Sequence, residues 1–409
     1  MLWCPGVLVV QSAAKIVIFM PRCGSYSGHD EVIFNSVPGY FVVDPFERRM
    51  MARTLELAAR ARGRTAPNPM VGAVVVKDGG VLAESYHCAA GEDHAEVAAL
   101  KKAGRQARGA TLVVNLEPCV HHGRTGPCAE AIIAAGIARV VIAMQDPNPL
   151  VRGRGIRKLR GAGIEVEVGL LGAQARRLNE VFIHHVRTGL PFVSLKLAQS
   201  LDGKITARPG TRTKITSSRA QRLTHRLRSQ HSCILIGVST ALADDPMLNV
   251  RFFSGAPQPV RVVLDPTLRI GLESRLVTTA GSYPTLVFHD PARSAGEKRD
   301  ALLNAGVELA SVKSGANGLF PGQAVLKALA GRGATSVLIE GGRSVATCFL
   351  REKLVQRLHL FISPLIFGES QALQAIGELG LEVLRLGHLE RTCLGPDTYL
   401  TGRIVYPES

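Results

Sequence analysis

The alternation of apolar and polar positions divides the chain into short predicted strands separated by predicted helices. In the first half, strands are expected at Val71–Lys77, Ala110–Leu116, Arg139–Met144 and Ile164–Val168. Helical spacing of apolar residues is found at Pro45–Gly63, His94–Ala103 and Cys128–Ala135. Single helices between successive strands predict right-handed crossovers, and therefore a largely parallel sheet with helices on both faces.

The same alternation restarts after a break at Gly189-Leu190-Pro191, which makes Asn179–Pro191 the expected connection between two domains. Further strands are expected at Phe192–Leu197, Cys233–Gly237, Val260–Leu264, Thr285–Phe288, Ser336–Ile339 and Leu358–Ile362. Helical patterns cover Ser218–Ser229 and Pro321–Ala330. We therefore expect an α/β protein with a first domain over residues 45–188 and a second over residues 189–409.

Residues 1–44 do not fit this pattern. They contain two short apolar runs interrupted by Lys15, Pro21 and Arg22, which is typical of neither a signal peptide nor a transit peptide. We interpret the segment as a poorly ordered extension. The alternative is a misassigned start, because Met50 and Met51 open the first convincing helix.

Composition narrows the class of protein. The chain is 46% hydrophobic, and no apolar run approaches the roughly 20 residues of a spanning helix, so we expect no membrane association. A net charge of +16 suits nucleic acid or a small phosphorylated substrate, but the 5% aromatic content is low for a base-stacking surface, so nucleic acid is not expected. Eight mostly isolated cysteines indicate a reducing, cytoplasmic location.

Three of the potential metal ligands follow one another in an ordered pattern. His94 precedes Cys119 and Cys128, and one imidazole with two thiolates suits Zn²⁺ while leaving a fourth tetrahedral position for water. Glu96 lies two residues after His94, about 200° around an ideal helix, so the metal must lie off the helix end. Glu96 then moves protons instead of binding metal, as in zinc deaminases. Helix N-termini also lower thiol pKa values, which favours the thiolates.

Other interpretations of this cluster remain open. Cys88 could compete as a ligand, the zinc could be structural, or the site could act on a flipped base of a nucleic acid. The spacing also departs from the usual deaminase signature, because eight residues separate Cys119 and Cys128 instead of two.

The long inter-cysteine segment at 116–128, Leu-Glu-Pro-Cys-Val-His-His-Gly-Arg-Thr-Gly-Pro-Cys, resembles one family. It is similar to the bifunctional diaminohydroxyphosphoribosylaminopyrimidine deaminase and aminophosphoribosylaminouracil reductase of riboflavin biosynthesis. Further blocks with the same resemblance are Pro67–Gly72, Ala143–Pro149, Gly153–Gly155, Lys196–Lys204, Leu242–Pro246 and Ile339–Gly342. The resemblance extends in order from about Met50 to Arg403.

This resemblance implies a cytidine-deaminase-like three-layer N-terminal domain and a dihydrofolate-reductase-like C-terminal domain. The first would deaminate a phosphorylated aminopyrimidine with one Zn²⁺, and the second would reduce its ribosyl group to ribityl with NADPH. A homo-oligomer is also expected. The positive net charge suits the substrate phosphate.

The resemblance also implies site residues. In the deaminase domain it assigns the substrate to Asn68, His87 and His121, with His122 beside the last. In the reductase domain it assigns the substrate to Arg212, Arg228, Leu248, Arg251 and Glu340. It assigns NADPH to Ala198, Lys214, Thr240, Asp244, Gly342, Arg343, Ser344, Val345 and Ala346. Asp244 is the candidate acid near hydride transfer, although Asp244-Asp245-Pro246 also fits a simple turn.

Four positions depart from the family pattern. Lys214 stands where the family commonly has Trp, Arg212 replaces a small polar residue, Val120 replaces Ser, and Asp93 replaces Pro. The first two fall in the expected reductase pocket. They raise the alternative that only the deaminase works and that the reductase domain is degenerate.

Overall fold

The computed structural model describes residues 44–121, 126–149, 151–210, 213–380 and 383–407, together with the backbone of two short strands near the N-terminus. These strands, β1 (Val9–Ser12) and β2 (Lys15–Ile18), pair antiparallel within the compact unit Met1–Val43. The rest of that unit, and with it the prediction of a poorly ordered extension, lies outside the described residues. Asp44–Ser409 forms the second unit.

The N-terminal half of the second unit is built on a five-stranded sheet of order β4-β3-β5-β6-β7. Its strands are β3 (Gly72–Lys77), β4 (Gly80–Tyr86), β5 (Thr111–Val114), β6 (Arg139–Ile142) and β7 (Glu165–Val168). The predicted parallel pairing holds for β5, β6 and β7, but β3 runs antiparallel to both neighbours. β4 was not predicted, although Asp78 and Gly79, with φ of 50° and 75°, form the tight turn that Asp-Gly favours in hairpins.

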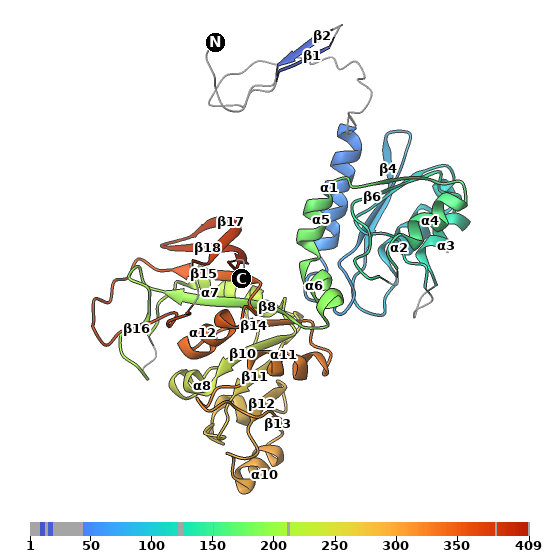
Figure 1. Ribbon diagram of the computed structural model, residues 1–409. Helices are drawn as coiled ribbons and strands as arrows, with labels where there is room; N and C mark the ends of the chain where they lie inside the picture. Colours follow the sequence, from blue (N-terminus) through green and yellow to red (C-terminus); the bar gives the residue numbers. More distant parts are fainter. Residues whose placement is uncertain are drawn as a thin grey trace. The chain divides into compact units, whose positions relative to one another are not determined.

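Helices cover both faces of this sheet, as predicted. Figure 1 shows α1 (Pro45–Ala59) and α5 (Gly172–Leu178) on one side, with α2 (Ala95–Ala103), α3 (Cys128–Ala134) and α4 (Arg154–Gly161) on the other. A 3₁₀ turn, η1 (Gly104–Ala107), follows α2. The close packing of α1 on β3 requires Gly72, because a Cβ there would lie 2.2 Å from the Thr54 carbonyl oxygen. This three-layer arrangement places the N-termini of α2 and α3 at one edge of the sheet.

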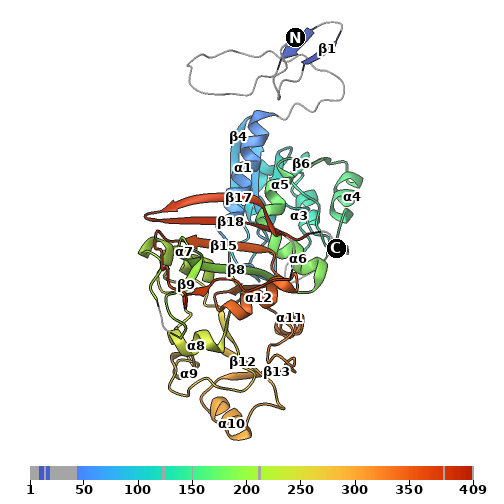
Figure 2. The same cartoon turned by 60° about the vertical axis from the view of Figure 1, so that its left-hand side comes forward.

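The C-terminal half contains a nine-stranded sheet of order β13-β12-β11-β10-β14-β8-β15-β18-β17. Its strands are β8 (Phe192–Gln199), β10 (Cys233–Gly237), β11 (Val260–Leu264), β12 (Thr285–His289), β13 (Glu308–Ser311), β14 (Ser336–Ile339), β15 (Arg357–Ile362), β17 (Arg385–Leu394) and β18 (Asp397–Val405). The predicted parallel pairing extends from β13 to β15, whereas β18 and β17 pair antiparallel at one edge (Figure 2). The sequence did not predict β13, β17 or β18, nor the separate pair β9 (Lys204–Thr206) and β16 (Leu373–Gln374).

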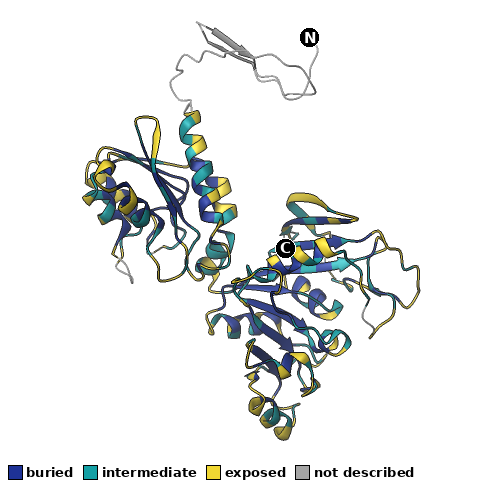
Figure 3. Ribbon diagram, turned by 180° about the vertical axis from the view of Figure 1, so that it is seen from behind, coloured by how far each residue is buried: buried dark blue, intermediate teal, exposed yellow. Residues whose placement is uncertain are grey.

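Two helical layers bury this sheet, and its central strands are buried on both faces (Figure 3). On one face, α11 (Gly322–Ala330) and α12 (Arg343–Arg351) pack against alternate residues of β8. On the other, α7 (Ser218–Arg228) packs against Leu338 and Phe361. Shorter helices are α8 (Val238–Asp244), α9 (Arg275–Thr278) and α10 (Gly296–Asn304). The carboxyl ends of β8, β10 and β14 therefore lie at one edge, where α8 and α12 begin.

The connection between the two sheets is mostly helical, which the sequence analysis did not predict. α6 (Glu180–Thr188) occupies most of Asn179–Pro191 and ends at Gly189, whose φ of 69° is typical of a helix C-cap. Glu180 accepts two hydrogen bonds from Arg357 of β15, at 2.7 and 2.9 Å. Among the described residues, no helix has both the length and the apolar character needed to cross a bilayer.

Candidate active sites

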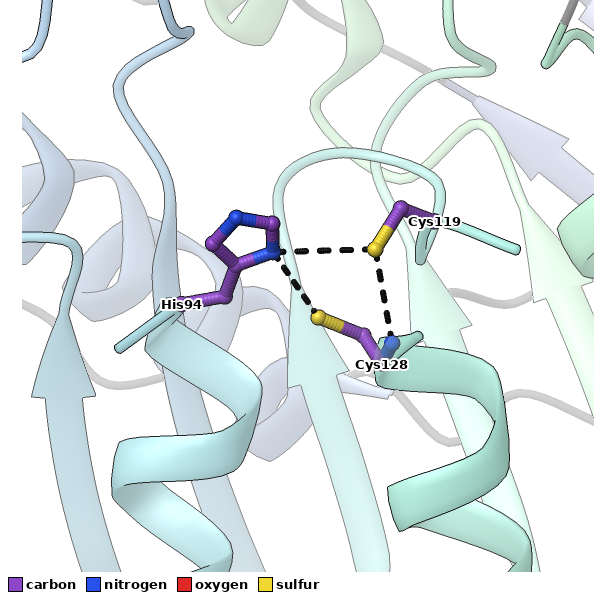
Figure 4. Close-up of side chains that lie close together, drawn as sticks. All are labelled: His94, Cys119 and Cys128. Atoms are coloured by element: carbon purple, nitrogen blue, oxygen red, sulfur yellow. Dashed lines mark hydrogen bonds between the residues drawn. The ribbon is translucent and has the colours of Figure 1, made fainter. Parts of the chain in front are cut away.

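The three predicted metal ligands meet at one edge of the first sheet. His94 is the N-cap residue of α2, Cys128 is the first residue of α3, and Cys119 lies in the loop that precedes α3. Figure 4 shows the three side chains pointing toward one another. The Nδ1 atom of His94 is 3.1 Å from the Cys128 sulfur and 3.6 Å from the Cys119 sulfur.

This donor set fits a tetrahedral zinc ion. Ligand bonds of about 2.1 Å to nitrogen and about 2.3 Å to sulfur imply nitrogen–sulfur separations of about 3.5 Å, close to those observed. In the described part of the chain the cluster comprises three ligand groups within 4.8 Å of one another, which leaves one tetrahedral position for water. Cys88, the proposed competitor, is exposed and directs its thiol toward the Tyr86 carbonyl.

The two thiols differ in proton affinity. A hydrogen bond from Cys128 lowers the pKa of Cys119 to about 4, whereas the hydrogen bond with Cys119 and burial raise the pKa of Cys128. The hydrogen bond between the two sulfur atoms therefore favours a thiolate at Cys119 beside a neutral thiol at Cys128, because two adjacent buried thiolates repel one another. A divalent cation removes this repulsion and so suits the site.

Glu96 lies in the first turn of α2 and is 4% exposed. Burial raises the pKa of Glu96 to about 7, and the neighbouring Cys119 adds to the rise. A carboxyl with such a pKa can both accept and donate a proton near neutral pH.

The predicted substrate residues Asn68 and His87 lie beside the predicted metal ligands. The Asn68 amide nitrogen is 3.3 Å from Nε2 of His87, whose ring packs edge-to-face on His94 with a centroid separation of 5.4 Å. His87 lies in the loop that directly follows β4, and it is only 2% exposed. Burial lowers the pKa of His87, which favours the neutral ring. His121 is exposed, and His122 lies outside the described residues.

Two buried asparagines that the sequence analysis missed hold the segment next to Asn68. Asn179 bonds both the amide and the carbonyl of Met70, at 2.8 and 2.9 Å. Asn115 accepts from Gly72 at 2.8 Å and donates to the Met70 carbonyl at 3.0 Å. Neither residue stands in a recognisable motif, so only the tertiary structure assigns them this role.

The second domain brings together the predicted substrate residues Arg228 and Glu340. The guanidinium of Arg228 forms two hydrogen bonds with the Glu340 carboxylate, at 2.6 and 2.8 Å, and a third with the Asn249 carbonyl at 3.1 Å. Both side chains are largely buried, with exposures of 12% and 5%. Arg228 lowers the pKa of Glu340, although burial opposes the effect.

Lys196 adds a second cation to this cluster. Its ammonium lies 5.6 Å from the centre of the Phe361 ring, and its charge interacts with Glu340, Arg228 and Asp244. Burial lowers the pKa of Lys196, and Glu340 and Asp244 oppose that effect. Lys196 stands in one of the motifs that carried the resemblance, but the sequence analysis gave it no role.

The predicted cofactor residues gather around the glycine pair after β14. Gly342 is the N-cap residue of α12, with φ of 74°, and a Cβ on it would lie 3.1 Å from the Thr240 hydroxyl. Arg343 and Ser344 are the first two residues of α12, while Val345 and Ala346 are buried and can offer a cofactor only their backbone. Amides at such a helix N-terminus suit a pyrophosphate.

The remaining predicted reductase residues differ in their surroundings. Leu248 is 3% exposed with φ of 48°, and Arg251 donates to the Asn249 side chain at 3.0 Å. Ala198 is half-buried near the carboxyl end of β8, and Lys214 is exposed. Arg212 lies outside the described residues.

Comparison with known proteins identifies both domains. Residues 45–144 match the cytidine and deoxycytidylate deaminase zinc-binding region, and residues 191–400 match the RibD C-terminal domain. The riboflavin biosynthesis protein RibD of Aquifex aeolicus is 43% identical over 340 residues, which cover 83% of this chain and 92% of that protein. The chain belongs to the RibD family.

Solved structures of the RibD family share the whole fold. Form 1 of Acinetobacter baumannii RibD has a TM-score of 0.78 at 35% identity and covers 88% of this chain and 99% of its own. The deaminase/reductase from Thermotoga maritima has a TM-score of 0.75 at 35% identity and covers 88% and 98%. The predicted pair of a cytidine-deaminase-like and a reductase domain is therefore confirmed.

Proposed function

We propose that this bifunctional enzyme of riboflavin biosynthesis deaminates a diamino-phosphoribosylamino-pyrimidinone with one Zn²⁺ and then reduces the ribosyl group to ribityl with NADPH. Family membership supports the two activities. The observation that carries the zinc chemistry is the cluster of His94, Cys119 and Cys128 beside a buried Glu96.

In the deaminase site, each side chain has a defined task. When bound by His94, Cys119 and Cys128, Zn²⁺ acts as a Lewis acid that activates water for attack on the ring. Glu96 takes a proton from the attacking water and delivers it to the departing amino group, so that the ring gains oxygen and ammonia leaves. Asn68 reads the pyrimidine edge with its amide, and the neutral His87 orients that amide.

In the reductase site, charged residues surround the sugar. The backbone amides at the N-terminus of α12, beginning at Gly342, would hold the pyrophosphate of NADPH, which would supply the hydride that reduces the ribosyl carbon. Opening of the ribose requires a proton on the ring oxygen, and we assign this proton to the group that contains Asp244, Lys196 and Glu340. Arg228 orients Glu340 through two hydrogen bonds.

The alternative of a degenerate reductase domain is not favoured. The RibD C-terminal domain matches residues 191–400, which include Arg228 and Glu340. Their ion pair at 2.6 Å is also intact. The effects of Arg212 and Lys214 on reductase activity, the expected homo-oligomer and the expected cytoplasmic location stay predictions.

A one-pot assay tests this proposal. Purified protein given the diamino substrate should release ammonia, and NADPH should be oxidised only after the deaminated product has formed. Glu96→Ala should abolish ammonia release, keep bound zinc and still oxidise NADPH when the deaminated product is supplied. Retained deamination in Glu96→Ala contradicts the mechanism, and absence of NADPH oxidation contradicts the second activity.

A further inference from the structure

A carboxylate that the catalytic mechanism does not use lies two residues before the ligand Cys119. Glu117 is 3% exposed, and among the residues that the structure describes its two oxygens accept hydrogen bonds only from backbone amides. One oxygen accepts from Asp146 at 3.1 Å and from Gly153 at 2.9 Å. The other accepts from Gly155 at 2.9 Å and from Ile156 at 3.3 Å.

These amides belong to the start of α4 and to the loop before it. Gly153 is the N-cap residue of α4, and Gly155 and Ile156 lie in its first turn. Glu117 therefore neutralises a helix N-terminus, where a carboxylate is favourable, and pairs amides that are otherwise without a partner inside the helix. Its own amide donates to the Met144 carbonyl at 3.0 Å, so the residue joins three separate segments.

Backbone packing fixes the same contact sterically. A Cβ on Gly155 would lie 2.1 Å from the Pro118 carbonyl oxygen and 3.2 Å from Cγ of Glu117. The start of α4 thus lies directly against the Glu117-Pro118 turn. The distance between the two is set by the hydrogen bonds of Glu117, because no side chain at Gly155 separates them.

The other side of this turn carries the metal ligand. The Cys119 carbonyl accepts from the Ala129 amide at 3.1 Å, and the Cys119 sulfur accepts from the Cys128 amide at 3.3 Å. Cys119 is therefore held between α3, which contacts it directly, and α4, which reaches it through Glu117. Its sulfur must stay within a few tenths of an ångström of the tetrahedral position to bind zinc well.

We propose that Glu117 is a positioning residue for the metal site, which holds the Pro118-Cys119 turn against α4 and thereby fixes the sulfur of Cys119 relative to His94 and Cys128. This inference rests on the proposed function of that site. Glu117 also fixes the Asp146 backbone, so the same carboxylate shapes the loop that follows β6. Substitution of residues that orient metal ligands typically lowers metal affinity or activity by about 10- to 100-fold.

Substitution by glutamine is the sharpest perturbation. Glu117→Gln keeps the size of the side chain but replaces one acceptor oxygen by an NH₂ group. Whichever way the amide is turned, that group faces two backbone N–H donors, either those of Asp146 and Gly153 or those of Gly155 and Ile156. Glu117→Asp keeps the charge but is shorter by one methylene, so its loss of metal affinity should lie between those of the wild type and Glu117→Gln.

The experiment loads the full-length protein with Co²⁺, whose absorption reports the geometry of a His-Cys-Cys site. Glu117→Gln should bind Co²⁺ and Zn²⁺ about 10- to 100-fold more weakly and show an altered Co²⁺ spectrum at saturation. Deamination should fall in parallel, while NADPH oxidation with the deaminated substrate should not change. The matched control is Glu165→Gln, which removes an exposed carboxylate that pairs with Arg139 at 3.0 Å. This control should leave metal affinity, the Co²⁺ spectrum, deamination and NADPH oxidation unchanged.

Two results separate this inference from the function on which it rests. A wild-type protein that takes up no metal contradicts the proposed function. Unchanged Co²⁺ affinity and spectrum in Glu117→Gln, beside a metal-binding wild type, contradict only the role of Glu117. If Glu117→Gln does not fold, Glu117→Asp decides: an altered spectrum at saturation supports the positioning role, and a wild-type spectrum and affinity overturn it.

Discussion

Replacing Glu340 by glutamine tests whether the buried ion pair of the second domain serves stability, catalysis or both. In the wild type, the Glu340 carboxylate bonds Arg228 twice and acts on the ammonium of Lys196. Glu340→Gln removes one negative charge between two cations that are both largely removed from water. Lys196 should then lose its proton more readily, because Glu340 raises its pKa.

The expected cost follows from burial. With 12% exposure of Arg228 and 5% of Glu340, loss of one partner leaves a buried guanidinium without its anion. Removing one partner of a buried pair costs about 3–5 kcal/mol in free energy of unfolding. For a domain of this size each kcal/mol lowers Tm by about 2–4 °C, so the reductase transition should move down by roughly 10 °C.

Calorimetry and NADPH oxidation together give the answer. Glu340→Gln should lose NADPH oxidation and stability, whereas ammonia release from the diamino substrate should stay at the wild-type level. The double variant Arg228→Met/Glu340→Leu should recover most of the stability, because an apolar pair needs no compensation, but none of the reductase activity. Wild-type Tm and NADPH oxidation in Glu340→Gln, or a double variant no more stable than the single one, would refute the reasoning.

Three further predictions concern other parts of the chain. Removing zinc with a chelator should stop ammonia release and leave NADPH oxidation intact in the same sample; joint loss of both activities contradicts independent sites. Asn179→Ala should leave the Met70 amide without its partner and lower the free energy of unfolding, measured by chemical denaturation, by about 1–3 kcal/mol. It should also raise the KM of deamination more than the KM of reduction. An unchanged KM of deamination contradicts a link between Asn179 and the Asn68 segment. Burial, and then Arg228 and Arg251, lower the pKa of His225 from 6.5 to about 4, so the unfolded state takes up a proton first as the pH falls. The stability that the neutral His225 contributes to the folded state should be complete above pH 6.5 and should be lost as the pH falls toward about 4. The urea midpoint of His225→Gln should therefore depend less on pH in that window than the midpoint of the wild type.

The local sequence predicted the cluster of His94, Cys119 and Cys128, which the structure brings together although 25 and 34 residues separate His94 from the two cysteines. His94 and Cys128 each stand at the start of a helix, and those helices follow from apolar spacing and from Pro127. The same applies to most parallel strands, which are buried on both faces and read as short apolar runs. Strands with one exposed face were missed, among them β4 and the edge strand β17. The apolar signal of such strands is weaker than the signal of the turns that join them.

The reductase site shows what local pattern does not contain. Arg228 and Glu340 are 112 residues apart, and their contact exists because β14 lies between β10 and β8 in the sheet. That strand order also brings Lys196 beside Glu340. In the first domain, the Met70 segment before β3 meets Asn179, which lies between α5 and α6 and is 109 residues away. The amino-acid sequence by itself determined which side chains can bind metal and where helices and strands begin. The tertiary structure decided which distant side chains share a site, because strand order and helix packing set the distances between them. It also decided which of those side chains are buried, and the loss of water on burial shifts their pKa values.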